Sequence, residues 1–534
     1  MTRPAPRWLL LSLLAATFPA VCPAGSPPRP PNIVLIVADD LGYADVSFNP
    51  RHAREVTTPN LDRLAARGVR FDRAYCAFPL CGPSRNSMLT GLYPDSTGIY
   101  QNSQIFRQTI PAQPSLPQAF RQQGWFAARI GKAYHYNVPN SIGTVGHDDP
   151  ASWELGLNPA GVDRLEEHPR IFSLTPGQFG GTLSWYASPK GDLLHTDGLM
   201  ATDAEWVLER CARQPERPFF LTVGFFRPHT PYVAPKPYFD LYPLEKMRIV
   251  QGVKEDQADI PAPGLMSYKR EQDALTDDLR RQALQAYYAS ISFLDAQVGR
   301  VIDALDRLDL ARKTIIVFTS DHGYHTGEHG LWQKQSLFEE SARVPLLIVA
   351  PGVAKAGGAA ASPVGHIDLY PTLTSLAAVA APSNLQGQDL TPLLRDPGAL
   401  GRGWALTQVM RSAGAASAAA PAGGKRRAKA AAATPPAAPA AKAGQAGGNR
   451  FPGYSLRTAR WRYTEWDEGR RGRELYDHDT DPRELTNLAE NPAHAANVAD
   501  LSRRLREAAR AAHPASGTPP IVQEGLWAPI VAAP

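Results

Sequence analysis

Four short apolar runs constrain the fold of this chain more than any other feature. They occupy residues 32–38, 125–130, 219–224 and 314–320 and are rich in β-branched and aromatic side chains. A strand that is covered on both faces of a parallel sheet has this continuous apolar pattern. Segments that suit helices lie between the runs, at 59–65, 199–213 and 278–309. We therefore expect an α/β fold with a large central, mostly parallel sheet flanked by helices.

Polar side chains follow each run. They are Asp39 and Asp40 after the first run, Lys132 and His135 after the second, His229 after the third, and Asp321 and His322 after the fourth. Ligands of such sheets bind outside the carboxyl ends of the strands, so we expect these side chains to share one pocket. Three carboxylates in one pocket repel one another without a cation, and oxygen ligands favour a hard ion such as Ca²⁺ or Mg²⁺. Asp39, Asp40 and Asp321 are therefore candidate metal ligands, and His322 supplies either a nitrogen ligand or a hydrogen bond.

The segment from Cys81 to Gly91 has the pattern of a helix start. Pro83 suits the first position of a helix, and we expect the helix to end at Gly91. The free N–H groups and partial positive charge of a helix N-terminus would favour an anion at residue 81. Taken alone, the pattern also fits a buried cysteine in a turn.

The eleven residues 81–91, with Cys-x-Pro-Ser-Arg followed by Leu-Thr-Gly, resemble the signature of the sulfatase family. Further strings resemble the iduronate-2-sulfatase branch, at 131–135, 227–229, 242–245, 319–323, 327–330 with Trp332 and Lys334, and 453–458. The resemblance implies the alkaline-phosphatase-like fold and hydrolysis of sulfate esters. It also implies that a maturation enzyme oxidises Cys81 to formylglycine, an aldehyde whose hydrate is the nucleophile.

The same resemblance implies roles for the candidate residues. One Ca²⁺, with Mg²⁺ less favoured, would be held by Asp39, Asp40, Cys81 in its modified form, Asp321 and His322. The catalytic residues around the formylglycine and the sulfate would be Cys81, Arg85, Lys132, His135, His229 and Lys334. The implied substrate is a sulfated saccharide, such as an iduronate 2-sulfate or another sulfated uronic acid, or another sulfate ester. Residues 140–195, which we expect to form long loops, depart from the family and would set the sugar specificity.

Two other functions fit the same residues. A phosphonate or phosphate ester hydrolase of this fold would use the same metal site. A glycan-binding protein without catalytic activity would keep the pocket but leave Cys81 as a thiol.

The two ends of the chain and one internal segment differ from the rest. Residues 1–24 have two arginines, an apolar run at 8–18 and small residues after it, which is the pattern of a signal peptide. The run is shorter than the roughly 20 residues that cross a bilayer, so we expect export to the periplasm or beyond and no stable membrane insertion. Residues 25–411 would form the catalytic domain. Residues 412–449 are Ala-, Pro- and Lys-rich, which predicts a disordered insertion, and residues 450–534 would form a C-terminal subdomain with antiparallel strands and a helix at 498–511.

Charge and cysteine content exclude some partners. The formal net charge is +5, but residues 1–24 and 412–449 hold seven basic side chains and no acidic ones. The rest of the chain is nearly neutral, which argues against a nucleic-acid surface. Three cysteines, Cys76, Cys81 and Cys211, follow the signal segment. An odd number predicts at least one thiol outside a disulfide and leaves open whether Cys76 and Cys211 are paired.

Overall fold

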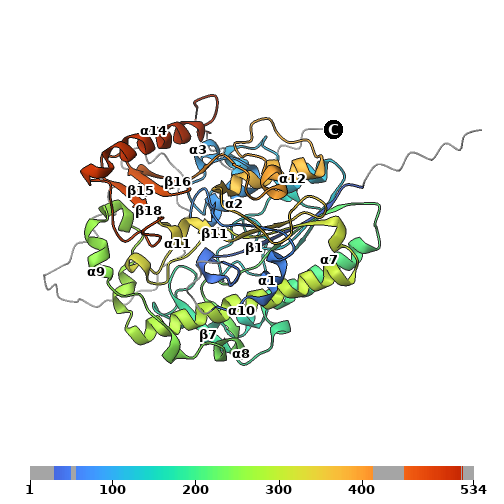
Figure 1. Ribbon diagram of the computed structural model, residues 1–534. Helices are drawn as coiled ribbons and strands as arrows, with labels where there is room; N and C mark the ends of the chain where they lie inside the picture. The colour runs from blue at the N-terminus through green and yellow to red at the C-terminus, as the bar shows by residue number, and fades with distance from the viewer. Residues whose placement is uncertain (1–28, 50–55, 413–449, 519, 521–534) are drawn as a thin grey trace, which may run out of the picture. The chain divides into compact units, whose positions relative to one another are not determined.

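An eight-stranded sheet forms the centre of the fold in the computed structural model, which describes residues 29–49, 56–412, 450–518 and 520 (Figure 1). Its strands, in spatial order, are β13 (Gly358–Ala360), β2 (Val69–Phe71), β12 (Leu346–Val349), β10 (Thr314–Ser320), β1 (Asn32–Ala38), β8 (Phe219–Gly224), β4 (Phe126–Gly131) and β5 (Leu155–Leu157). The pairs from β10 to β5 are all parallel, whereas β12 runs antiparallel to β10 and β2. The expected α/β fold with a mostly parallel sheet is confirmed.

The register of the parallel strands brings their carboxyl ends to one edge of the sheet. Ala38 of β1 pairs with Ser320 of β10, and Gly224 of β8 pairs with Val37 on one side and Gly131 on the other. The residues that follow these four strands therefore begin at the same level. This register explains why polar side chains that are far apart in sequence meet at one place.

Both faces of the sheet are covered, which accounts for the continuous apolar runs. Val34 and Ile36 of β1 belong to a core shared with α10 (Asp277–Arg307), α1 (Pro59–Ala65) and α7 (Thr196–Ala212). Ile33, Leu35 and Val37 point to the opposite face, whose core includes α2 (Cys81–Thr90), α5 (Leu116–Gln122), α12 (Leu369–Ala377) and α13 (Thr391–Arg395). Figure 1 shows α1 and α10 on one side of β1, and α2 and α12 on the other. Successive residues of β1 thus alternate between two buried cores.

A second, smaller sheet is wholly antiparallel, as expected for the C-terminal part. It contains β15 (Trp404–Ser412), β16 (Arg450–Thr458), β17 (Trp461–Trp466) and β18 (Arg473–Asp477), and α14 (Ala495–Ala511) packs on it. Strand β15 was not expected. It pairs with β16 along its whole length, from Trp404 opposite Thr458 to Ser412 opposite Arg450. Ser412, which the composition assigned to the insertion, is therefore the last residue of a strand.

Residues 140–195 are more ordered than the sequence predicted. In place of continuous loops they contain β5, α6 (Val162–Leu165), β6 (Phe172–Ser173) and β7 (Ser184–Ser188). Strand β7 pairs with both β6 and β9 (Tyr232–Pro235). Turns and loops make up most of the segment, as predicted. Strand β7 was missed because its partner β9 lies more than forty residues further along the chain, and no local pattern indicates that pairing.

The remaining elements are short. A three-stranded sheet contains β11 (Arg343–Val344), β3 (Ala74–Tyr75) and β14 (Val364–Gly365), and the other helices are α3 (Pro94–Thr97), α4 (Phe106–Thr109), α8 (Lys236–Asp240), α9 (Val253–Asp256) and α11 (Glu339–Ala342). The described residues from Pro31 to Pro520 form one compact unit. Within the described ranges, no helix combines the length and the apolar character that a bilayer crossing requires. The predicted signal segment 1–24 and residues 413–449 of the predicted insertion lie outside those ranges.

Candidate active site

Helix α2 places Cys81 at its N-terminus. The helix begins at Cys81 and not at Pro83, because the N–H of Ser84 already donates to the carbonyl of Leu80. Pro83 thus lies within the first turn, where its missing N–H leaves no gap in the helix. The helix ends at Gly91 as expected, and Gly91 has a φ of 69°, a left-handed conformation that favours glycine.

Three side chains from other segments surround the thiol of Cys81, which is 1% exposed. His322, just after β10, has its Nε2 atom 3.3 Å from Sγ. Lys334 has its Nζ atom 3.2 Å from Sγ. His135, which follows β4, also lies close enough to Cys81 for the two side chains to affect each other's pKa. Two basic groups and one further imidazole therefore face the residue at position 81.

The two adjacent aspartates after β1 reach different cations. Asp39 Oδ2 accepts a hydrogen bond from Lys132 Nζ at 2.6 Å, and Asp40 Oδ1 accepts one from Lys334 Nζ at 2.6 Å. Asp40 has a φ of 68°, which is uncommon for a residue with a side chain. Its N–H donates to Asp321 Oδ1 at 3.2 Å. This turn brings the carboxylates of Asp39, Asp40 and Asp321 together, as the sequence predicted.

Arg85 links the carboxylates of Asp39 and Asp321. Its side chain is fully buried. Its Nε donates to Asp321 Oδ2 at 2.8 Å, and its Nη2 donates to Asp39 Oδ1 at 3.4 Å. The Nη1 group donates to the carbonyl of Lys132. The guanidinium thus fixes two carboxylates and the main chain after β4, so its observed contacts orient the other site residues.

His229 enters the site from the turn after β8. Its Nδ1 atom lies 2.6 Å from the carbonyl of Thr230, and its Nε2 atom lies 3.7 Å from Asp40 Oδ2. The turn is held by Asp197, whose carboxylate accepts the N–H groups of Phe226 and Arg227 at 3.1 and 2.9 Å. One ring nitrogen of His229 is therefore directed at the carboxylates.

The surrounding charges change the protonation of the central groups. Burial opposes ionisation of Cys81, but the positive charges of Lys132, Lys334 and His322 outweigh it and hold the pKa of the thiol well below its usual range. Burial lowers and the Asp321 carboxylate raises the pKa of His322, which reaches about 9. An anion at position 81 is thus favoured by its neighbours.

Two further shifts concern proton transfer and metal binding. Burial lowers the pKa of His135 to about 4, so its imidazole is neutral at pH 7 and can accept a proton. Burial raises the pKa of Asp39 to about 7, even though Lys132 acts in the opposite direction. A carboxylate that ionises with such difficulty gains from an added cation.

Several side chains in the site bring together donor atoms that can hold a metal ion. Donor atoms of Asp39, Asp40, Cys81 and His229 lie within 4.8 Å of one another, and so do donors of Cys81, Asp321 and His322. Asp40 Oδ2 is buried and accepts no hydrogen bond. The predicted ligands therefore fall into two groups that share Cys81. His229, which the sequence placed among the catalytic residues, also lies among these donors.

Other residues near the site escaped the sequence analysis. The hydroxyl of Tyr287 in α10 donates to the carbonyl of Asp40 at 2.7 Å and accepts the N–H of Gly42 at 3.0 Å, which secures the turn after β1. The sequence showed Tyr287 only as an apolar position of the helix. The ammonium of Lys269 interacts electrostatically with Lys334 and Asp40. No motif marks Lys269, so no signal in the sequence could have found it.

Comparisons with known proteins agree with this geometry. A family model described as Sulfatase matches residues 31–379. A curated protein of Formosa agariphila named Sulfatase is 35% identical over 391 residues, which cover 71% of this chain and 75% of that protein. The iduronate 2-sulfatase of Mus musculus is 32% identical over 372 residues, which cover 65% of this chain and 66% of that protein.

Solved structures share the fold at lower identity. The phosphonate monoester hydrolase of Agrobacterium radiobacter superposes with a TM-score of 0.70 at 22% identity, over 90% of this chain and 96% of that chain. A protein solved in complex with its substrate D-glucosamine-2-N,6-O-disulfate superposes with a TM-score of 0.65 at 21% identity, over 91% of this chain and 98% of that chain.

Proposed function

This chain belongs to the sulfatase family, a family of sulfuric ester hydrolases, and from that premise we propose that it hydrolyses sulfate esters of saccharides through a formylglycine made from Cys81. The proposal rests on the position of Cys81. Residue 81 lies at a helix N-terminus, against the side chains of His135, His322 and Lys334. A nucleophile at this position would meet the sulfate among positive charges that stabilise the added negative charge.

In the proposed first step, one hydroxyl of the hydrated aldehyde at position 81 loses its proton to solvent, and its oxygen attacks the sulfur atom. The S–O bond to the saccharide breaks, and His229 or a lysine donates a proton to the departing alkoxide. Lys132 and Lys334 supply fixed positive charge beside the transferred sulfate. These groups are held in place by Asp39 and Asp40, so the site needs little rearrangement.

In the proposed second step, His135 accepts the proton of the remaining hydroxyl. The aldehyde then re-forms as the bond between residue 81 and the sulfate breaks, and inorganic sulfate leaves. The low pKa of His135, about 4, suits it to this role, because the ring is neutral at the pH where a base is needed. The aldehyde is regenerated without a co-reactant other than water.

We further propose that one Ca²⁺ is held by Asp39, Asp40, Asp321 and His322 together with residue 81. When bound, such an ion would polarise a sulfate oxygen and neutralise the crowded carboxylates. The unpartnered Oδ2 atom of Asp40 supports the proposal. Activity should disappear after chelation and return on addition of Ca²⁺. A fully chelated protein with full activity would contradict the proposed metal site.

The formylglycine route is tested by Cys81→Ser. A serine ester of sulfate lacks the second hydroxyl, so the variant should take up one sulfate and then stall. Mass spectrometry of the peptide that contains residue 81 should detect aldehyde in the native protein and a single sulfate on the variant. Repeated turnover by Cys81→Ser would overturn the mechanism. An unmodified, inactive thiol in natively expressed protein would favour a glycan-binding protein.

A phosphonate or phosphate ester hydrolase is the second candidate, because the phosphonate monoester hydrolase of Agrobacterium radiobacter shares the fold over most of both chains. The same cations and carboxylates would serve a phosphoryl group. Comparing an aryl sulfate with the matching aryl phosphate and phosphonate separates the two. We expect the larger kcat/KM for the sulfate.

We also propose that the protein is exported to the periplasm or beyond and acts on a sulfated uronic acid, as in an iduronate 2-sulfatase. The support is the signal-like pattern of residues 1–24 and the 32% identity to the mouse enzyme. N-terminal sequencing of the secreted protein tests the first point. Activity against defined sulfated saccharides tests the second.

A further inference from the structure

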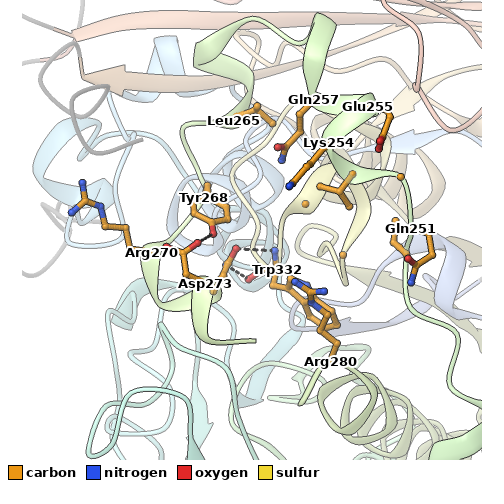
Figure 2. Close-up of a pocket in the computed structure, with 16 residues that line it drawn as sticks. Gln251, Lys254, Glu255, Gln257, Leu265, Tyr268, Arg270, Asp273, Arg280 and Trp332 are labelled. Atoms are coloured by element: carbon orange, nitrogen blue, oxygen red, sulfur yellow. Dashed lines mark hydrogen bonds between the residues drawn. The ribbon is translucent and has the colours of Figure 1, made fainter. Parts of the chain in front are cut away.

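A large pocket with mixed polar and apolar lining lies next to the loop that carries Lys334. Its volume is about 870 Å³, within the range of small-molecule sites. One wall comes from residues 250–257, the other from residues 265–273 and the start of α10, and Trp332 lies between them (Figure 2). None of the ten predicted site residues lines this pocket. Its lining is therefore distinct from the side chains that surround position 81.

The loop that contains Trp332 and Lys334 reaches both the pocket and the catalytic centre. The side chain of Gln272 holds the main chain of Trp332, since its Nε2 donates to the Trp332 carbonyl at 2.9 Å. That same carbonyl accepts a hydrogen bond from the hydroxyl of Tyr324 at 3.1 Å. Two residues beyond Trp332, Lys334 reaches Cys81. The wall of the pocket is thus hydrogen-bonded to the loop that supplies a catalytic lysine.

Residues 268–273 form part of the pocket wall and also bring one cation toward the catalytic centre. Tyr268, Arg270 and Asp273 line the pocket, whereas the ammonium of the intervening Lys269 donates to the carbonyl of Gly181 and lies within electrostatic range of Lys334 and Asp40. A molecule that filled the pocket would therefore lie next to a segment whose cation, Lys269, interacts with the charges around position 81. This placement suits the remainder of a substrate whose sulfate is held at the catalytic centre.

The lining of the pocket favours a polar, acidic occupant. Its cations are Lys254, Arg270 and Arg280, and its acids are Glu255 and Asp273. The hydroxyl of Tyr268 donates to Asp273, which occupies one hydrogen-bond acceptor oxygen of that carboxylate. The rest of the lining includes amide side chains, the ring of Trp332 and the aliphatic side chains of Val250, Val253 and Leu265. This mixture matches the hydroxyl groups and apolar faces of a sugar.

We propose that this pocket binds the saccharide unit beyond the sulfate ester, and that Arg280 selects a unit carrying a second acidic group. The inference rests on the proposed saccharide sulfatase function. Arg280 donates to Asp277 at 3.0 Å, with the two side chains 39% and 56% exposed. Exposed pairs of this kind contribute little, so the guanidinium can turn to a carboxylate or sulfate of the ligand at small cost. A guanidinium binds either group through two parallel hydrogen bonds.

The test compares Arg280→Gln with a matched control, Arg281→Gln. Arg281 is the next residue of α10, pairs with Asp278 in the same way, and does not line the pocket. The probes are an unsulfated disaccharide of two glucuronic acid units and the same disaccharide with the carboxyl group of its reducing-end unit reduced to an alcohol. Calorimetry gives the Kd of each probe, and kcat/KM is measured with the sulfated disaccharide and with an aryl sulfate.

We expect Arg280→Gln to weaken binding of the acidic disaccharide by about 10- to 100-fold, the range of a charge-assisted hydrogen bond. Binding of the reduced disaccharide and hydrolysis of the aryl sulfate should not change. Arg281→Gln should behave as wild type. Equal affinities of wild type and Arg280→Gln for the acidic probe, or no binding of that probe to wild type, would overturn the pocket assignment. Failure of wild type to cleave any sulfate ester would instead refute the proposed function, while the Kd values would still decide the role of Arg280.

Discussion

Glu339→Gln is expected to lower the free energy of unfolding by about 4 kcal/mol, because three guanidinium groups converge on this buried carboxylate. Oε1 accepts from Arg457 Nε at 3.0 Å and from Arg462 Nη2, and Oε2 accepts from Arg343 Nη1 at 3.1 Å. The hydroxyl of Tyr75 donates to Oε1 as well, at 2.8 Å. The carboxylate therefore joins α11 to strands β16 and β17 of the small sheet.

The magnitude follows from burial. The Glu339 side chain is fully buried, and Arg457 and Arg462 are 1% exposed. Removing one partner of such a pair leaves uncompensated charge in the interior, which costs about 3–5 kcal/mol. Glutamine keeps the shape but supplies one acceptor oxygen in place of two. At about 2.1 cal/mol/K per residue, a unit of roughly 500 residues should lose about 4 °C in Tm.

Thermal and urea unfolding followed by tryptophan fluorescence measure this effect, with Glu507→Gln as the control. Glu507 pairs with Arg503 on α14 at 3.0 Å, and both side chains are about 60% exposed, so this substitution should cost less than about 0.5 kcal/mol. Burial alone would raise the pKa of Glu339, but the charges of Arg457 and Arg462 outweigh this effect and hold the pKa well below its usual value. The contribution is therefore fully present above the unfolded pKa and is lost only as pH falls toward the lower folded value. A loss below about 1 kcal/mol at pH 7 would refute the reasoning.

Three other outcomes can be measured. Burial raises the pKa of Glu474 to about 7, so the wild-type protein should lose stability as the pH rises through that value. The variant Glu474→Gln has no carboxyl group to ionise and should not show this loss. Its free energy of unfolding relative to wild type, measured with urea, should therefore increase by about 2.5 kcal/mol between pH 5 and pH 9. Gly131 has a φ of 68° and an added Cβ would lie 2.7 Å from a carbonyl of β8, so Gly131→Ala should cost at least about 2 kcal/mol in the same assay and lower kcat by displacing the next residue, a site lysine. Cys76, Cys81 and Cys211 form no disulfide, so a thiol assay of the denatured mature protein should find two thiols after conversion of Cys81 and three without it.

Local patterns predicted the four parallel strands β1, β4, β8 and β10 and the place where the candidate side chains meet. Asp39, Lys132 and Asp321 could be placed because each follows a buried strand, and the register of parallel strands then brings the strand ends together. Helices α1 and α10 were predicted within two residues of their observed ends, since apolar spacing and capping are local signals.

Contacts between distant segments could not be predicted in this way. Tyr287 supports the turn at Asp40 from 247 residues away, and its hydroxyl is indistinguishable in the sequence from that of any buried tyrosine. Lys269 lies in a segment without a motif. The strand β15 was missed because its partner β16 follows only after residues 413–449, so no hairpin pattern joins the two.

The pairing of Ser412 with Arg450 has a consequence for engineering this protein. Because β15 and β16 are neighbouring strands, the last residue of β15 lies directly beside the first residue of β16. The closure entropy of whatever joins them grows only with the logarithm of its length. The joining segment can therefore be shortened to a tight turn, or replaced by an affinity tag or a second domain, while the pairing of β15 with β16 is kept.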